Sequence, residues 1–231
     1  MKRRITLFVM SSLLLIITYS SYGQTSSKNS IEIQSGYNRG FGIIGSFTIH
    51  NIAEGLPGNI RLGIGYNRLS PGNAPDARRI FINNATNGFP EKKGKSFDYR
   101  IDYMKPYTLF DLKNSYLVFG PRYSSFTANF NYVGGNENFD VTSKQWGIGL
   151  GAENYFKMSS KLDLVFAVGL DYFFNSSLKG HDTVYSPNDD NINARDDNQN
   201  NDVEFTYKDA NKAIKQPQFM PRILIGVSYH L

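Results

Sequence analysis

The chain contains no cysteine in its 231 residues. It therefore has no disulfide framework, no thiolate metal ligand and no cysteine nucleophile, and it lacks the residue through which bacterial lipoproteins are lipidated. Tryptophan occurs once and histidine three times, whereas the chain has 15 tyrosines, 17 phenylalanines and 21 glycines. Aromatic residues and glycines in such numbers favour twisted strands and turns over helices. We expect one all-β domain, as is usual for β proteins of this length.

Long apolar runs are also absent, except near the first residue. The basic residues Lys2–Arg4 precede an apolar segment at 5–17, and Gly23 ends a small-x-small cleavage site. This order is that of a secretory signal peptide, and the apolar segment is shorter than the roughly 20 residues of a spanning helix. The expected division is a cleaved signal peptide at 1–23, a short leader at 24–30 and a single domain at 31–231.

The net charge of +5 depends largely on this signal peptide. Residues 1–23 carry three positive and no negative charges, so their removal lowers the net charge from +5 to +2. Little basicity remains in the mature chain, and we expect no nucleic-acid partner. No later window reaches the length of a spanning helix, but the strands of a membrane barrel, about 9–11 alternating residues each, escape such a scan.

Eight segments of the mature chain alternate apolar and polar residues with a period of two, so each strand offers one face to each of two environments. The expected strands are 31–37, 41–49, 60–69, 97–107, 115–130, 141–156, 162–174 and 220–231. The long connections, 70–96 and 175–216, fall at one end, whereas 53–59, 108–114 and 158–161 are short. This pattern predicts an eight-stranded antiparallel up-and-down transmembrane β-barrel.

The polar face of these strands is rich in Gly, Ser and Asn, unlike the Lys- and Glu-rich exterior of a soluble barrel. Small residues suit the narrow interior of an eight-stranded barrel, where buried charges persist only when they are paired. We therefore expect the polar face to line the lumen and the apolar face to meet lipid. The expected lumen charge network consists of Glu32, Arg61, Asp98, Arg100, Asp102, Arg122, Glu153, Asp163, Asp171 and Arg222.

Aromatic residues gather near the ends of the apolar face, where the aromatic girdles of membrane barrels meet the bilayer interfaces. They are Tyr66, Tyr99, Tyr103, Tyr107, Tyr123, Tyr172, Phe174 and Tyr229. Pro121 and Pro221 fall inside expected strands, and a closed barrel has no free edge to excuse their missing N–H groups. We expect a bulge at each proline, or strands that begin later.

The segment Met220–Leu231 alternates to its last residue, with Leu224 as the one apolar side chain on the polar face. Its motif Gly226-x-x-Tyr229-x-Leu231, together with the strand count and loop asymmetry, resembles the OmpA/OmpX-like family of small outer-membrane barrels. The resemblance covers nearly all of 30–231, although the family usually ends in Phe and has a polar residue in place of Leu224. It implies that Gly226, Tyr229 and Leu231 form an assembly signal read by the barrel-assembly machinery in the outer membrane of a Gram-negative bacterium.

Few residues point to other chemistry. His50 and His230 lie at strand ends and His181 in a long loop, with no Ser/His/acid grouping, so we expect neither an enzyme nor a cofactor. Alternating oxygen ligands make a weak calcium motif in the second long loop, without the glycine and glutamate of an EF-hand. The four residues of this motif are Asp196, Asn198, Asn200 and Asp202. Three lysines of the first long loop, Lys92, Lys93 and Lys95, are candidates for contact with lipopolysaccharide phosphates.

The sequence thus predicts a monomeric, non-enzymatic integral outer-membrane β-barrel. Its partners are outer-membrane lipid, lipopolysaccharide and the assembly machinery, and the outward loops 70–96 and 175–216 are expected to carry any surface recognition. Two alternatives stay open: a narrow porin-like channel for small solutes, and a secreted soluble ligand-binding β-barrel.

Overall fold

The computed structural model describes residues 29–53, 57–82, 87–108, 112, 114–181, 183–188, 193–196 and 202–231. The expected signal peptide and nearly all of the expected leader lie outside these residues. Among the described residues, no helix is long and apolar enough to cross a membrane.

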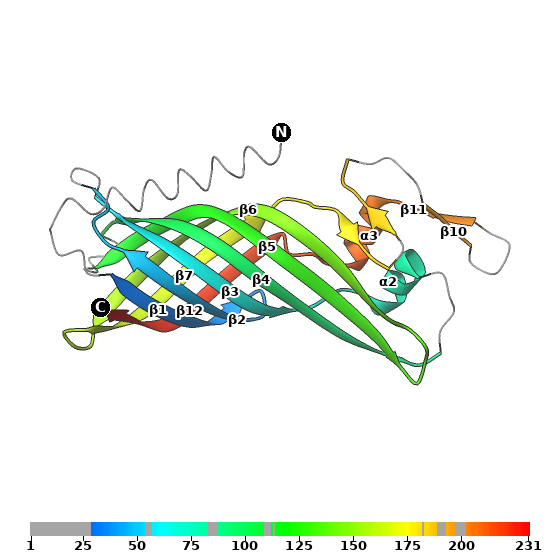
Figure 1. Ribbon diagram of the computed structural model, residues 1–231, viewed down its shortest axis with the longest axis horizontal. Coiled ribbons are helices and arrows are strands. Elements are labelled where there is room, and N and C mark those ends of the chain that lie inside the picture. Colours follow the sequence, from blue (N-terminus) through cyan, green and yellow to red (C-terminus); the bar gives the residue numbers. More distant parts are fainter. Residues whose placement is uncertain are drawn as a thin grey trace.

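Eight antiparallel strands close into a barrel in which each strand pairs with its neighbours along the chain (Figure 1). Closure is made by β1 and the last strand, whose register runs from Ser30 opposite His230 to Asn38 opposite Arg222. The eight strands are β1 (Ser30–Asn38), β2 (Phe41–Ile49), β3 (Asn59–Leu69), β4 (Phe89–Pro106), β5 (Ser115–Val133), β6 (Asn138–Lys157), β7 (Leu162–Phe173) and β12 (Phe219–His230). The predicted eight-stranded up-and-down barrel is confirmed.

The connections differ in length between the two ends of the barrel. The β2–β3, β4–β5 and β6–β7 connections lie at one end, which we name the short-turn end, together with the C-terminus at the left of Figure 1. The opposite, long-loop end holds the β3–β4 and β7–β12 connections. Small elements lie within these two connections: α2 (Ala74–Phe81), β8 (Leu178–Lys179), β9 (Val184–Tyr185), β10 (Asn193–Asp196), β11 (Asp202–Phe205) and α3 (Tyr207–Ala213).

The first long loop is shorter than the expected 70–96, because β4 begins at Phe89 rather than Phe97. Between these residues both faces of the strand are polar or small, with Glu91, Lys93 and Lys95 outward, so no apolar alternation marks it. Pairing with β5 makes it a strand, from Phe89 opposite Val133 onward. Pairing with another strand therefore determines the secondary structure here, where the local sequence pattern does not.

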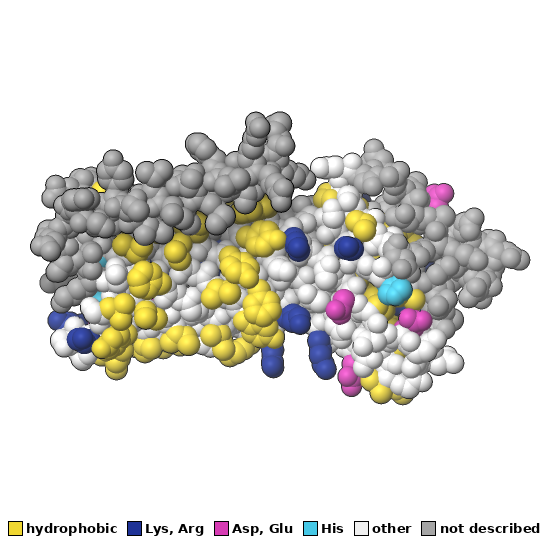
Figure 2. Space-filling view, in the orientation of Figure 1, with side chains coloured by type: hydrophobic (Ala, Val, Ile, Leu, Met, Phe, Trp, Pro, Cys, Tyr) yellow, Lys and Arg dark blue, Asp and Glu magenta, His cyan; other side chains and the backbone are white. Residues whose placement is uncertain are grey.

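The polarity of the wall inverts along the longest strands. In the half of β5 nearer the short-turn end, Phe119 and Tyr123 point outward and Arg122 inward; further on, Thr127 and Asn129 point outward and Phe126 inward. Figure 2 shows the same change on the surface, where the apolar side chains gather on one half of the barrel and Lys and Arg side chains border them. We name the apolar half the belt and the part beyond it the cap.

The cap has an ordinary apolar core. Phe126, Phe130 and Phe139 from β5 and β6 pack with Phe81 of α2 and Ile214 beyond α3, and all are almost fully buried. Both helices begin with a side-chain cap: Asn73 accepts from the Asp76 amide, and Thr206 forms a capping box with Asp209. The cap region therefore has the arrangement of a water-soluble domain, with its apolar residues inside.

The bulges expected at the two prolines are absent. The β4–β5 ladder omits the pairs opposite Pro121 and Gly120, but Arg100 opposite Arg122 and Tyr103 opposite Phe119 keep one register on either side. Pro221 lies one residue beyond the end of the β1 ladder, and its carbonyl accepts a hydrogen bond from the Arg39 amide. β12 also starts earlier than expected, at Phe219. The expectation was wrong because each missing donor falls at a gap or end of one ladder.

Candidate functional site: the barrel lumen and its two ends

Arg61 of β3 is the centre of one half of the lumen. Its guanidinium makes a two-pronged contact with Glu153 (Nη1–Oε2 2.7 Å, Nη2–Oε1 2.8 Å). It also reaches Glu32 Oε1 at 3.1 Å and Asp102 Oδ2 at 3.2 Å. All four side chains are at most 2% exposed. A planar guanidinium with five N–H donors suits this bridging between several carboxylates.

Asp171 of β7 holds the second half. Its carboxylate binds Arg122 Nε at 2.9 Å and Arg100 Nη2 at 3.2 Å, and it accepts a further hydrogen bond from Arg222. Arg122 joins the halves, because its Nη2 lies 2.7 Å from Asp102 Oδ1. Four arginines and four acids thus form one chain of ion pairs, supplied by every barrel strand except β2.

Eight of the ten residues expected in the lumen network therefore come together, and two do not. Asp98 faces the lumen nearer the cap, where its carboxylate accepts from the Asn67 amide. Asp163 lies at the short-turn end and contacts His230 at 2.7 Å, so its placement in the network was wrong. The register explains this, since Asp163 pairs with Ser228 next to the end of β12.

Sequence reasoning missed several lumen residues. The Tyr155 hydroxyl lies within hydrogen-bond distance of both Glu32 Oε2 (2.8 Å) and Glu153 Oε2 (3.0 Å), and Gln34 donates to Glu32 Oε1 at 2.6 Å. Parity along β6 would have found Tyr155, because it shares the inward face with Glu153. Tyr155 thus reaches Glu32 Oε2, an oxygen that Arg61 does not contact, while Gln34 shares Glu32 Oε1 with Arg61.

Leu224, the apolar exception in the last strand, also has a place. It points into the lumen and forms a small buried cluster with Ile44 of β2 and Ala167 of β7. β2, which contributes no charged residue to the network, thus places the apolar side chain of Ile44 in the lumen. An eight-stranded barrel interior is narrow enough to be filled in this way.

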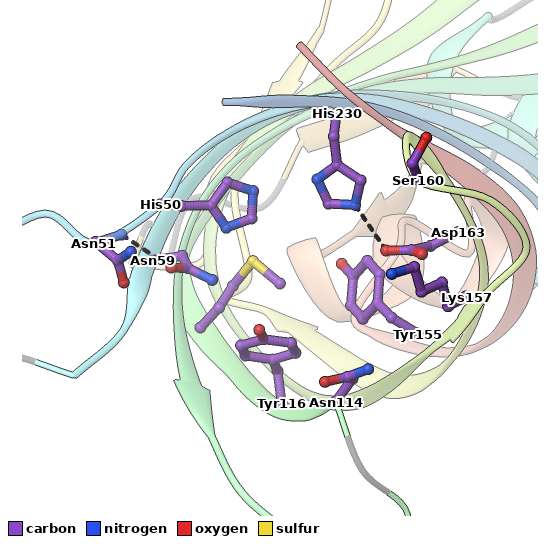
Figure 3. Close-up of a pocket in the computed structure, with 11 residues that line it drawn as sticks. His50, Asn51, Asn59, Asn114, Tyr116, Tyr155, Lys157, Ser160, Asp163 and His230 are labelled. Carbon is purple, nitrogen blue, oxygen red and sulfur yellow. Dashed lines mark hydrogen bonds and ion pairs between the residues drawn. The ribbon is translucent and has the colours of Figure 1, made fainter. Parts of the chain in front are cut away.

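The short-turn end opens into a cavity of about 450 Å³ (Figure 3). His50 and His230 lie across it with ring centroids 6.0 Å apart, and Lys157, Tyr116 and Tyr155 complete its wall. Burial, helped by repulsion from His230, lowers the pKa of His50 below its ordinary 6.5. We name this cavity the vestibule; Tyr155 in its wall also contacts Glu32 and Glu153 of the Arg61 ion pairs.

One serine–histidine contact in this vestibule escaped the sequence analysis. Ser30 Oγ lies 2.9 Å from His50 Nε2, and the two residues are brought together by the pairing of β1 with β2. Ser30 is buried, and the neighbouring carboxylate of Asp163 binds His230 instead of His50. Nucleophilic catalysis needs an accessible hydroxyl, and the buried Ser30 does not provide one.

The residues of the expected calcium motif lie largely outside the described part of the chain. Asn198 and Asn200 lie outside the described residues, as do the side chains of Asp196 and Asp202. Elsewhere in the described part of the chain, no three His, Asp or Glu side chains are grouped to hold a metal ion. His181 lies in the cap segment between β8 and β9.

The residues of the expected assembly signal lie along the short-turn half of β12. Gly226 faces the lumen, where a Cβ would come within 2.1 Å of the Ile33 carbonyl oxygen, so a larger residue would push β1 and β12 apart. Tyr229 and Leu231 are outward and about half exposed. Their aromatic and apolar side chains extend the belt to the short-turn end of the barrel.

Comparisons with known proteins bear on the fold. No family model matches the chain, and no curated protein sequence matches it. Among solved structures, a major outer membrane protein from Thermus thermophilus is 21% identical, with 90% of this chain and 100% of that chain covered and a TM-score of 0.71.

CarO and CarO2 from Acinetobacter baumannii also match, at 12% and 13% identity over 89% of this chain, and over 97% and 100% of theirs. Their TM-scores are 0.36, too low for these two structures to support a statement about the fold. The chain has the fold of a closed eight-stranded barrel of the kind that this outer-membrane protein forms.

Proposed function

We propose that this chain is an OmpA/OmpX-like integral outer-membrane barrel, without enzymatic activity, whose cap is a surface for recognition outside the cell. The observation that carries the proposal is the inverted polarity of the belt half. Ile33, Ile64 and Ile225 are about half exposed on the outer wall, while Arg61 and Arg122 are buried within. Exposed apolar area of this extent is stable when lipid covers it, and costs free energy in water.

The same polarity argues against a secreted ligand-binding barrel. Such a protein needs an apolar lumen and a polar exterior. Here Arg61, Asp102 and Arg122 occupy the lumen and are at most 2% exposed, so charged side chains and not apolar ones fill this part of the lumen.

The lumen chemistry argues against a channel as well. Ion pairs cross the belt from Glu32 on β1 to Asp171 on β7, and the core of Phe126, Phe130 and Phe139 lies above them. A solute would have to break charged contacts held in a dry environment and then pass an apolar core. Recognition is therefore assigned to the cap, which carries α2, α3 and most of the chain outside the belt.

Two measurements test the proposal. The full chain is expressed with its N-terminal segment, cells are fractionated, and the protein is run on gels with and without boiling. We expect it in the outer-membrane fraction with a mobility that changes on boiling; recovery as a soluble protein contradicts the proposal. In planar bilayers we expect no steps above the baseline current, whereas steady conductance steps would favour the narrow channel.

A further inference from the structure

Two grooves lie on the outer wall of strands β3 to β6. We call the one nearer the cap the upper groove and the one nearer the short-turn end the lower groove. The upper groove, about 650 Å³, is at the border between belt and cap and is lined by Arg68, Lys93 and Lys95, among others. The lower groove, about 300 Å³, lies in the belt and is lined by Leu62, Tyr99, Ile101, Pro121, Tyr123 and Trp146, together with backbone of neighbouring residues. Residues of the same four strands thus line a charged groove and an apolar one.

The cations of the upper groove are held close by the sheet register. Arg68 pairs with Lys95 across β3 and β4, and Lys93 is two residues along on the same outward face. All three are exposed, and no ion pair in the described part of the chain involves them. Asp140 is the one acid of this groove, and its carboxylate accepts from Asn129. The groove therefore keeps a net positive charge of two, counted over Arg68, Lys93, Lys95 and Asp140.

Lys92 adds a fourth cation, although its ammonium already donates to the Gly72 carbonyl at 3.0 Å. Polar neighbours on β5, Thr127 and Asn129, supply further hydrogen-bonding groups to the groove. Clustered cations beside hydroxyl and amide groups are the donor set that recognises a phosphate.

Pro121 is a small side chain among the bulkier ones that line the lower groove. Its neighbours across the sheet are Ile148 on β6 and, at the gap in the ladder, Ile101 on β4. Tyr123 and Trp146 stand at its upper edge, with ring centroids 5.1 Å apart. The result is a narrow, almost wholly apolar depression that an acyl chain fills well.

The spacing of the two grooves fits one lipid molecule. Lys95 and Ile101 are six residues apart on the outward face of β4, which is about 20 Å along a strand. At the roughly 40° tilt of barrel strands this is about 15 Å of depth, half of the roughly 30 Å hydrocarbon core. A headgroup at Lys95 therefore places its acyl chain at the level of Ile101 within one leaflet.

We propose that β3 to β6 form a binding site for a phosphorylated lipid of the leaflet next to the cap. Its phosphate lies among Arg68, Lys93 and Lys95, and one acyl chain lies in the groove of Leu62, Pro121 and Trp146. On β1, β2 and β12 the outward side chains at the corresponding border include Tyr37, Phe41 and Phe219, which carry no charge. This inference rests on the proposed membrane insertion and adds a ligand to it.

Trp146, the single tryptophan of the chain, is a built-in reporter at this site. The full-length barrel in phosphatidylcholine nanodiscs is titrated with phosphatidic acid that carries bromine on its acyl chains, and quenching of tryptophan fluorescence is followed. Brominated phosphatidylcholine at the same mole fraction is the reference. We expect phosphatidic acid to quench more strongly and at lower mole fraction, and equal quenching by the two lipids would overturn the proposal.

Charge variants then locate the headgroup. The triple variant Arg68→Gln, Lys93→Gln, Lys95→Gln is expected to weaken the phosphatidic acid response on the order of a hundredfold, because each cation near a membrane surface contributes about fivefold. The matched control is Lys105→Gln, Lys157→Gln, Lys161→Gln at the short-turn end, which is expected to behave as the parent. Equal responses of the two triple variants contradict the assigned site.

A third arm separates lipid from free phosphate. Inorganic phosphate and glycerol 3-phosphate are added as competitors, and we expect neither to displace brominated phosphatidic acid at equal concentration, because they lack the acyl chain. Displacement by either would overturn the lipid assignment. Boiling-dependent gel mobility is measured on each sample, so that loss of insertion, which would count against the proposed function, is read separately from loss of lipid preference.

Discussion

Arg61 of β3 and Glu153 of β6 meet inside the lumen through two parallel N–H···O contacts of 2.7 and 2.8 Å. Parallel contacts of this kind combine charge attraction with a fixed orientation. Because Arg61 also reaches Glu32 and Asp102, three buried carboxylates share this single guanidinium. This pair and other contacts lead to predictions at four places in the structure.

The first concerns Arg61→Met. It would leave Glu32, Asp102 and Glu153 buried without their shared cation, and breaking a buried ion pair costs about 3–5 kcal/mol. Arg100→Met is the matched comparison, since Arg100 makes one ion pair, with Asp171. Urea unfolding of the refolded barrel, followed by gel mobility, should rank the variants as parent, Arg100→Met, Arg61→Met in decreasing stability. Equal midpoints for the parent and Arg61→Met would show that the network contributes no stability.

The second concerns the apolar contact inside the lumen. Leu224→Ala removes buried methyl groups from the cluster with Ile44 and Ala167 and should lower the free energy of unfolding by about 2–3 kcal/mol. Ile225→Ala, its neighbour on the outward face, is the control and should cost less, because lipid fills the space that the outward side chain leaves and no cavity forms. The same urea titration measures both, and the reverse order would mean that the inward and outward faces of β12 are exchanged.

The third concerns the capping box of α3. Thr206→Ala removes the hydroxyl that caps the Asp209 amide and should destabilise the cap locally by about 1 kcal/mol. Limited proteolysis of the folded barrel at pH 7 measures this as faster cleavage near α3, with the belt strands unaffected. Cleavage at an unchanged rate would mean that packing alone holds the helix.

The same box gives a pH dependence. Hydrogen bonds from Thr206 lower the pKa of Asp209 below its ordinary 3.8. A carboxyl with a lowered pKa in the folded state stabilises it above the unfolded pKa and loses that contribution as the pH falls through the folded pKa. Cleavage near α3 should therefore be constant down to about pH 5 and accelerate below 3.8, and Asp209→Asn should remove this acceleration.

The fourth concerns the two histidines of the vestibule. Burial and repulsion by His230 hold the pKa of His50 below 6.5, so protonation of His50 is disfavoured in the folded state. Replacing the neighbour, as in His230→Gln, removes the repulsion and should raise the pKa of His50 while burial keeps it under 6.5. NMR titration of the imidazole resonances measures the change. An unaltered or lower pKa in the variant would exclude electrostatic contact between the rings.

Much of the barrel follows from parity along the strands. Ile31 and Ile33 point outward and Glu32 and Gln34 inward because a strand alternates its side chains, and the sequence carries this pattern wherever the two environments differ. The same rule placed Arg61, Asp102 and Asp171 on the inner wall. Parity did not predict which residues these side chains contact, however, because it determines the face of a strand and not the register between strands.

Other features depended on segments far apart in the chain. The strand through Lys93 and Lys95 shows no apolar alternation, and only its pairing with β5 reveals it. Asp163 has the parity of a lumen residue, yet its height on the wall places it beside His230. Height along the barrel depends on the stagger of every strand against the next, which no local pattern contains.

The amino-acid sequence by itself therefore determined the number of barrel strands, the direction in which each side chain points and the end that bears the long connections. These depend on local alternation and turn residues. Tertiary structure alone decided that Arg61 meets Glu153, that Leu224 finds Ile44, and that the charged and apolar grooves on β3 to β6 are aligned. Those contacts join residues that are distant in the chain, and closure of the sheet sets the register that brings them together.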